Sequence, residues 1–179
     1  MFDTEKMIDI LIPTVAQGLL WALLALGVYI TFRVLDIADL SVEGSFPLGA
    51  AVAATALVNG YGMLIAFFLA AIAGALAGIV TGFFTTRLKI PALLAGILTM
   101  IGLYSVNLHV MGKANVALLR VDTIFSYAES FGMSATVAML TVGVVAAVFI
   151  GCLMYWFFGT EIGTAIRATG SNSQMARAQ

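Results

Sequence analysis

Three acidic residues and an arginine lie close together in an otherwise apolar sequence, and these side chains have the clearest capacity for chemistry. Arg33, Asp36, Asp39 and Glu43 fall within eleven residues of one another. Carboxylates are costly inside a membrane and, where they occur, can hold a cation or a proton. Arg33 and Asp36 have the i,i+3 spacing of an ion pair, provided that a helix continues through them. General acid–base catalysis by Asp39 and Glu43 is disfavoured because no base partner accompanies them.

Other signatures of enzyme chemistry are missing from the sequence. It has no Gly-rich phosphate loop ending in Gly-Lys-Ser/Thr, no HExxH motif and no paired cysteines. Cys152 is the single cysteine and His109 the single histidine, so neither can complete a metal site. The net charge of −1 gives no electrostatic basis for binding nucleic acid. We therefore expect no enzyme activity, no metal and no cofactor in this chain, and no nucleic-acid partner.

The composition places the chain in a lipid bilayer. Of its 179 residues, 62% are hydrophobic and 9% are charged, and the mean hydropathy is +1.09. Soluble domains carry roughly 25% charged residues, so this much apolar surface requires lipid as its solvent. Long charge-free runs predict an all-α, polytopic membrane protein with about five transmembrane helices. The expected spans are 10–32, 46–58, 62–86, 90–112 and 136–158, which together form a transmembrane domain over residues 1–158.

The junction before the second span has the signals of a broken or re-entrant helix. Gly44, Ser45 and Pro47 follow the acidic residues closely. Ser45 is therefore expected to cap a new helix that has Pro47 in its first turn. The sequence Asn-Gly at residues 59–60 is a turn signal that divides the next charge-free run into a helical hairpin. Residues 113–134 are charged again and are expected to form a loop outside the membrane.

The basic residues orient the chain. Five spans place the two termini on opposite sides of the membrane, and the cytoplasmic side should carry the excess of arginine and lysine. A cytoplasmic C-terminus gives the expected excess. The inner residues are then Arg33, Arg87, Lys89, Arg167 and Arg177, and the outer residues are Lys6, Lys113 and Arg120. We therefore expect the N-terminus outside and residues 159–179, the C-terminal segment, in the cytoplasm.

Polar and aromatic residues at membrane depth are candidates for a translocation path. Intramembrane polar residues commonly face a pathway or hydrogen-bond a neighbouring helix, and helix packing is the alternative role for each of these. The candidates are Gln17, Asp39, Ser41, Glu43, Ser45, Phe46, Thr99 and Asn107.

Three stretches, in this order, resemble bacterial ABC importer permeases of the branched-chain amino acid, ribose and nucleoside type. They are LDIADLSVEGSFPLGAAVAA (Leu35–Ala54), RLKIPALLAGILTMIGLYSV (Arg87–Val106) and GTEIGTAIRATGSNSQMARAQ, the C-terminal segment. The first is similar to a helix-break motif of that family, and the second to a turn into the following span. The run Asp39–Phe46 is most similar to the subgroup for aromatic or other amino acids. Family members are longer, so the resemblance covers their N-terminal part.

The resemblance implies a membrane-spanning permease subunit of a bacterial ATP-driven importer for a small solute, with an amino acid as the expected solute. Its implied partners are an ABC ATPase subunit, an extracellular or periplasmic solute-binding protein and a second permease subunit, equal or different. ATP would bind on the ATPase subunit. The implied location is the inner or plasma membrane of a bacterium, which the chain crosses several times.

In the resemblance, the C-terminal segment corresponds to the cytoplasmic loop that couples to the ATPase. Glycines would bracket a short helix or turn, Asn172 or Ser171 would cap a following helix from Ser173, and arginines would offer donors to the partner. The expected coupling residues are Gly163, Ile166, Arg167, Gly170, Asn172, Met175, Ala176 and Arg177. The segment is expected to be cut short at Gln179.

Two other functions remain open on the sequence alone. An ion-coupled or passive transporter or channel would use Asp36, Asp39 and Glu43 as a cation or proton site beside a broken helix. A non-transporting scaffold fragment would contribute to a membrane assembly without any flux. The identity of the transported substrate is left open.

Overall fold

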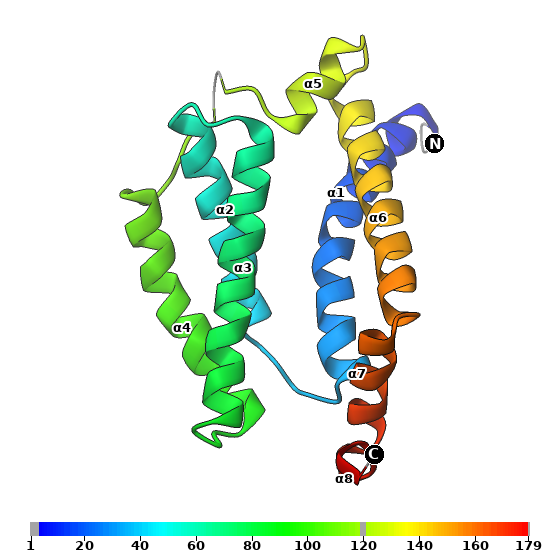
Figure 1. The fold of residues 1–179 in the computed structure, drawn as a ribbon. Coiled ribbons are helices and arrows are strands. Elements are labelled where there is room, and N and C mark those ends of the chain that lie inside the picture. The colour runs from blue at the N-terminus through cyan, green and yellow to red at the C-terminus, as the bar shows by residue number, and fades with distance from the viewer. Residues whose placement is uncertain (1–3, 119–120, 179) are drawn as a thin grey trace. The chain divides into compact units, whose positions relative to one another are not determined.

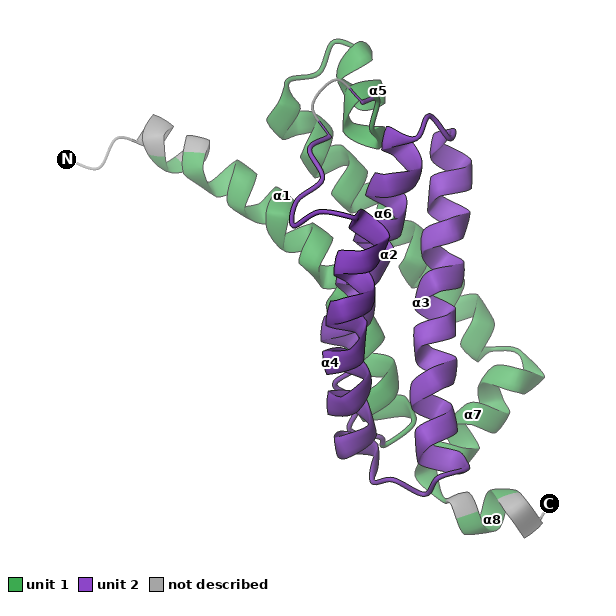
Figure 2. Cartoon of the chain, turned by 90° about the vertical axis from the view of Figure 1, so that its left-hand side faces the viewer, with its two compact units in different colours: residues 1–36, 122–179 green, residues 37–121 purple. Residues whose placement is uncertain are grey.

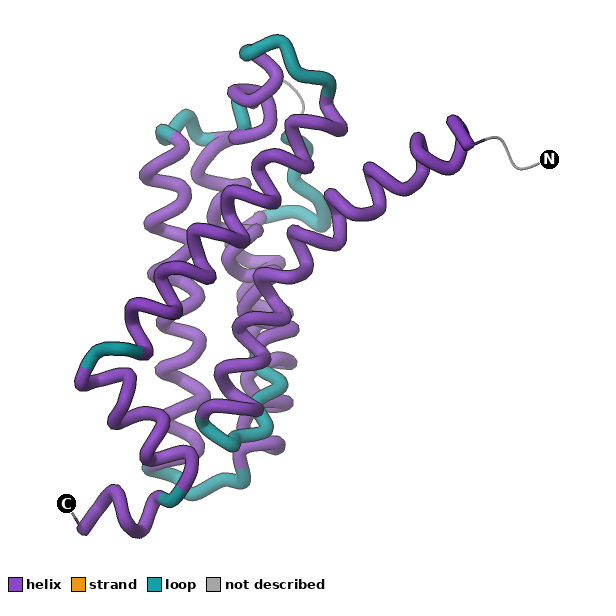
Figure 3. The backbone as a smooth tube through the Cα atoms, turned by 90° about the vertical axis from the view of Figure 1, so that its right-hand side faces the viewer, coloured by secondary structure: helices purple, strands orange, loops and turns teal. Residues whose placement is uncertain are grey.

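The fold is entirely helical over the residues described in the structure, a computed structural model that describes residues 4–118 and 121–178. Figure 3 shows helices joined by loops, and no strand occurs in that part of the chain. The chain divides into two compact units, coloured separately in Figure 2. Unit 1 comprises residues 1–36 and 122–179, and unit 2 comprises residues 37–121.

Unit 1 is built on the pairing of its two long helices. They are α1 (Thr4–Tyr29), which continues as a π-helical segment η1 (Ile30–Val34), and α6 (Ala135–Phe158). Figure 1 shows α1 and α6 side by side. Ala16 and Ala138 are fully buried in this unit, and small residues of this kind let helix backbones approach closely. Three short helices complete the unit: α5 (Ile124–Ser130), α7 (Glu161–Ser171) and α8 (Ser173–Ala178).

The helix of the first span ends before the acidic residues begin. Leu35 donates its backbone N–H to the Ile30 carbonyl at 3.0 Å, which is the i→i−5 bond of a π-turn. Asp36 then adopts a left-handed conformation with φ of 54°, which stops the helix. The i,i+3 geometry therefore does not arise, and Arg33 and Asp36 form no ion pair with each other in the structure. The condition for that pairing, a helix that continues through both residues, is therefore not met.

Unit 2 is a three-helix unit in which the shortest helix contacts both of the others. Its helices are α2 (Val42–Val58), α3 (Met63–Thr86) and α4 (Ala92–Met111). Helix α2 packs against α3 and α4, as Figures 1 and 2 show. Glycines make the closest approaches between α2 and α4. A Cβ atom added to Gly44 would lie 2.9 Å from the Met100 Cα, so a residue with a side chain would force the two helices apart.

The interior consists of small residues and the exterior of large apolar ones. Among the described residues, the buried apolar side chains are alanines except for Leu48 and Phe158. Large apolar residues point outward along the long helices, as Leu64 does with 72% of its surface exposed and Ile79 with 65%. Lipid supplies no hydrophobic drive between helices, so membrane helices associate through close packing of small residues. This distribution is that of a protein surrounded by lipid.

The length and composition of the helices confirm a polytopic membrane protein. Four are long and apolar enough to cross a membrane: Ile10–Val34, Met63–Thr86, Ala92–Met111 and Ala135–Phe158. Val42–Val58 is a shorter apolar helix and corresponds to the expected second span. The all-α prediction is therefore confirmed, with four full-length spans and one short apolar helix in the described residues.

The second helix begins earlier than expected. Ser41, rather than Ser45, occupies the N-cap position, and its carbonyl accepts bonds from the N–H groups of Gly44 and Ser45 at 3.0 and 2.9 Å. The Ser45 hydroxyl instead donates to the Val42 carbonyl at 3.4 Å. Pro47 consequently lies inside α2 and not in its first turn. Residues 113–134 include α5, whose N-terminus is closed by a capping box between Thr123 and Ser126.

A buried hydroxyl pair joins α3 to α4, and breaking it should weaken unit 2. The Thr81 hydroxyl donates to the Thr99 hydroxyl at 3.0 Å, and Thr99 is 4% exposed. Interhelical hydrogen bonds in membranes average about 0.6 kcal/mol, with a maximum near 1.7 kcal/mol. We expect Thr99→Val to lower the free energy of unfolding by about this amount in detergent. Thr86→Val is the matched control, since the Thr86 hydroxyl donates within its own helix; equal stabilities of the two variants would contradict the interhelical role.

Candidate functional site

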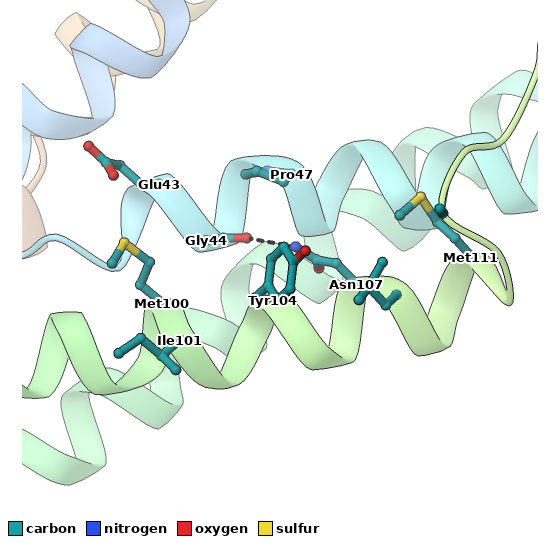
Figure 4. Close-up of a pocket in the computed structure, with 10 residues that line it drawn as sticks. Glu43, Gly44, Pro47, Met100, Ile101, Tyr104, Asn107 and Met111 are labelled. Carbon is teal, nitrogen blue, oxygen red and sulfur yellow. Dashed lines mark hydrogen bonds between the residues drawn. The ribbon is translucent and has the colours of Figure 1, made fainter.

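Unit 2 contains a cavity between α2 and α4 (Figure 4). Its volume is about 630 Å³, within the range of roughly 300–1,000 Å³ of small-molecule sites. Most of its wall is apolar. The lining residues are Glu43, Gly44, Pro47, Met100, Ile101, Tyr104, Asn107, Leu108, Met111 and Ala114.

Asn107 is the buried polar residue of this cavity. It is 7% exposed, and its Nδ2 donates to the Gly44 carbonyl at 3.5 Å, the contact marked in Figure 4. Its Oδ1 has no hydrogen-bond partner within the described part of the chain. The missing side chain of Gly44 brings α2 close enough for the amide to reach its backbone. One end of the amide is therefore fixed by α2, while the other end is an unused acceptor.

The residues just before α2 have a structural role. The Asp39 carboxylate accepts the Ser41 backbone N–H at 2.8 Å, an Asx-type turn that prepares the start of the helix. Ser41 is 3% exposed. The turn rests against α4 at Gly96, where an added Cβ atom would lie 2.7 Å from the Leu40 nitrogen. Asp39 and Ser41 thus set the position of α2 relative to α4.

The structure brings two of the predicted path residues, Glu43 and Asn107, to the cavity. Thr99 is engaged with Thr81. Phe46 is 44% exposed on α2. Gln17 is exposed on α1 and belongs to the other unit. The remaining candidates lie at the start of α2. Asp39 and Ser41 form the turn before this helix, and Ser45 lies in its first turn.

Sequence reasoning missed most of the cavity wall. For most lining residues on α4, the sequence predicted only that they belong to an apolar span. These residues are Met100, Ile101, Tyr104, Leu108 and Met111. Their spacing on α4 follows the i,i+3,i+4 pattern of one helix face, which was a usable signal once Asn107 had been placed.

The C-terminal segment forms two helices, α7 and α8, and α7 is held against the membrane helices of unit 1. Thr160 caps α7 by accepting the Gly163 N–H at 3.3 Å. An added Cβ atom at Gly163 would collide with the backbone of Phe157 and Phe158, and one at Gly170 with the Val34 carbonyl. Both glycines are needed for this close approach.

Two further predicted coupling residues also contact the chain itself. Ile166 shares an apolar cavity with residues such as Leu153 and Phe157. The Arg167 guanidinium lies over the Phe158 ring, 5.2 Å from its centroid, which is a cation–π arrangement. Arg167 also lines a polar cavity of about 660 Å³ together with Arg33. Gly163, Ile166, Arg167 and Gly170 thus attach α7 to its own unit.

The outward-facing residues of the segment are different ones. Asn172 caps α8, since its Oδ1 accepts the N–H groups of Gln174 and Met175, both at 3.1 Å. Met175 is 65% exposed and Ile162 is 66% exposed. Ala176 is partly exposed, and the Arg177 side chain lies outside the described parts. The sequence analysis did not single out Ile162, because its neighbours did not indicate which face of α7 would be exposed.

These features define a class: a polytopic, all-helical membrane protein with a solute-sized cavity and an amphipathic helical segment after α6 has the organisation of a permease. The chain belongs to the family described as "Branched-chain amino acid transport system / permease component", which it matches over residues 10–179. The resemblance inferred from three sequence stretches is confirmed by this match.

Two relatives are similar over most of the chain. The "Tyrosine transport system permease protein" of Clostridioides difficile (strain R20291) is 39% identical over 168 residues, covering 93% of this chain and 54% of the relative. An uncharacterised protein of Rickettsia prowazekii (strain Madrid E) is 33% identical over 167 residues, covering 93% of this chain and 57% of the relative. The chain therefore spans about half the length of these relatives. No solved structure matches it significantly.

Proposed function

We propose that the protein provides the membrane-spanning permease part of an ATP-driven importer for an amino acid. The observation that carries the proposal is the construction of α7 and α8. One face of α7 is fixed to the membrane helices by Gly163 and Gly170, while Ile162 and Met175 remain exposed. A segment that is fixed on one side and exposes apolar side chains such as Ile162 and Met175 among polar ones on its free side is suited to transmit motion between a soluble partner and the spans.

The partners follow from this role. An ATPase subunit would dock on α7 and α8 in the cytoplasm and would carry out ATP hydrolysis. A second permease subunit and an external solute-binding protein would complete the importer in a bacterial inner or plasma membrane. The family match and the name of the Clostridioides relative support an amino acid as solute. The excess of basic residues supports a cytoplasmic C-terminus and an external N-terminus.

An ion-coupled mechanism receives less support from the acidic residues. Asp39 is engaged by the Ser41 N–H, and Asp36 is exposed in the turn after η1. Among the described residues, no group of three or more His, Cys, Asp or Glu side chains is placed to hold a metal ion. Asp36 belongs to unit 1, whereas Asp39 and Glu43 belong to unit 2.

The docking role can be tested with one outward-facing residue of α7. Ile162→Asp introduces a charge on the exposed face, while an acidic residue in a first helical turn favours the helix itself. In the complete protein, co-expressed with its ATPase subunit, we expect this variant to retain at most about a tenth of the co-purified ATPase, which requires a loss of at least roughly 1.4 kcal/mol in affinity. Ser130→Asp, exposed in α5, is the control. Full retention of the ATPase by Ile162→Asp would refute the docking role.

A further inference from the structure

The polar cavity of unit 1, of about 660 Å³, lies where η1 and α7 meet. Its wall contains two arginines from different elements, Arg33 of η1 and Arg167 of α7. Among the described lining residues, Asp36 is the one acid. Figure 1 shows α7 beside the ends of α1 and α6. The fold therefore brings two guanidinium groups, far apart in the sequence, to one concave site.

Both guanidinium groups lack an anionic partner. Within the described part of the chain, neither Arg33 nor Arg167 forms an ion pair with a carboxylate. The cation–π contact of Arg167 with Phe158 supplies no acceptor for its N–H donors. Arginine binds phosphate through two parallel hydrogen bonds, a geometry that lysine does not have. Two guanidinium groups and the Asp36 carboxylate leave the cavity with one positive charge, which the single negative charge of a phosphodiester would neutralise.

The place of the cavity along the helices favours a lipid as the source of that phosphate. Val34 and Phe158 both line the cavity, and they are the last residues of the spans formed by α1–η1 and by α6. The ends of spans lie at the level of the lipid headgroups. Tyr29 and Phe32 also line the cavity and are 54% and 46% exposed, as is typical of aromatic residues at a membrane interface. A soluble phosphate compound would leave these rings uncovered.

We propose that this cavity binds the phosphodiester headgroup of an anionic phospholipid such as phosphatidylglycerol. Arg33 and Arg167 donate to the phosphate oxygens, while Tyr29 and Phe32 contact the glycerol backbone and the acyl chains of the lipid. Because Arg33 lies at the end of the first span and Arg167 on α7, one lipid molecule joins these two elements. The inference goes beyond the importer proposal and does not depend on it.

The test compares ligands that share either the acyl chains or the phosphate. Binding of dioctanoyl phosphatidylglycerol, dioctanoyl phosphatidylcholine and glycerol phosphate to the complete permease is measured by calorimetry in a nonionic detergent, and the titration of empty micelles is subtracted. We expect phosphatidylglycerol to bind at least about tenfold more tightly than either of the other two. Equal affinities for the two lipids would mean that the arginines serve only the helix ends, and would overturn the proposal. Glycerol phosphate that binds as tightly as phosphatidylglycerol would overturn the lipid assignment.

An arginine variant and its control assign the binding to the cavity. Arg33→Gln is expected to weaken phosphatidylglycerol binding by about tenfold, because it removes a charged pair of donors. Arg33 is exposed and unpaired, so the melting temperature without lipid should not change. Arg87→Gln is the matched control, since it removes the same charge from an exposed arginine at the end of α3 in unit 2. The control should bind the lipid as the wild type does, and equal affinities of the two variants would overturn the assignment.

A variant of the acidic residue tests the same site with the opposite sign. Asp36 has a left-handed backbone with φ of 54°, which asparagine adopts as aspartate does, so Asp36→Asn should keep the turn after η1. Removing this carboxylate raises the positive charge of the cavity, and we expect phosphatidylglycerol to bind about threefold more tightly. Unchanged or weaker binding of phosphatidylglycerol by Asp36→Asn would contradict the placement of the phosphate in this cavity.

Discussion

Replacing Gly170 with alanine is expected to detach α7 from the end of the first span and to abolish co-purification of the ATPase. The added methyl group would overlap the Val34 carbonyl, and its other neighbours are the Val34 carbonyl carbon and the Leu35 Cα. These are backbone atoms, which cannot rotate away as a side chain can. Overpacking of this kind costs about 1–3 kcal/mol or more. Helix α7 can avoid the cost by moving away from Val34 and Leu35.

The measurement is the amount of ATPase retained by the complete permease, with the melting temperature as a second readout. Gly151→Ala in α6 is the matched control, because nothing lies within 4 Å of an added methyl group there. Alanine is favoured over glycine in a helix by about 0.5–1 kcal/mol, so the control should be as stable as the wild type or more stable. If Gly170→Ala retained as much ATPase as the wild type, docking of the ATPase would not depend on the contact between α7 and Val34.

Among the glycine-to-alanine substitutions in unit 2, Gly96→Ala is expected to be the most destabilising. The new Cβ atom would lie 2.7 Å from the Leu40 nitrogen and 3.0 Å from the Asp39 Oδ1. It would therefore clash with the turn in which Asp39 accepts the Ser41 N–H, and this clash would disrupt the N-terminus of α2. We expect a loss on the order of 3 kcal/mol in the free energy of unfolding.

Thermal unfolding of the purified protein in detergent measures this effect. Gly102→Ala lies on the same helix, where an added methyl group meets nothing within 4 Å, and should melt no lower than the wild type. The account of the α2–α4 contact fails if Gly96→Ala and Gly102→Ala have the same melting temperature.

The membrane helices were predictable because lipid leaves few choices. Uninterrupted apolar runs made α3 and α6 evident, and the Asn-Gly turn marked the end of α2. The start of α2 was less predictable. Ser41 and Ser45 are equally good N-cap residues by type, and the choice depends on the Asp39 carboxylate, which binds the Ser41 N–H. A local side-chain contact of this kind decides a helix boundary without changing the apolar pattern.

Roles within the sites depended on contacts that spacing does not reveal. Gly163 and Gly170 suggested the ends of a short helix or turn, and they lie near the two ends of α7, where they serve close packing against Phe157 and Val34. Asn107 was one of several intramembrane polar residues until its position against Gly44 became known. The tertiary contact between α2 and α4 separates it from Thr99, which Thr81 already satisfies.

The central claim is that this chain belongs to an importer driven by ATP, and uptake into vesicles tests it most directly. The complete permease would be reconstituted with its ATPase and binding proteins, and entry of labelled tyrosine would be measured with and without ATP, and with ionophores that collapse ion gradients. The account predicts uptake that requires ATP hydrolysis and persists with the ionophores. Uptake that proceeds without ATP and stops when an ion gradient is collapsed would contradict it.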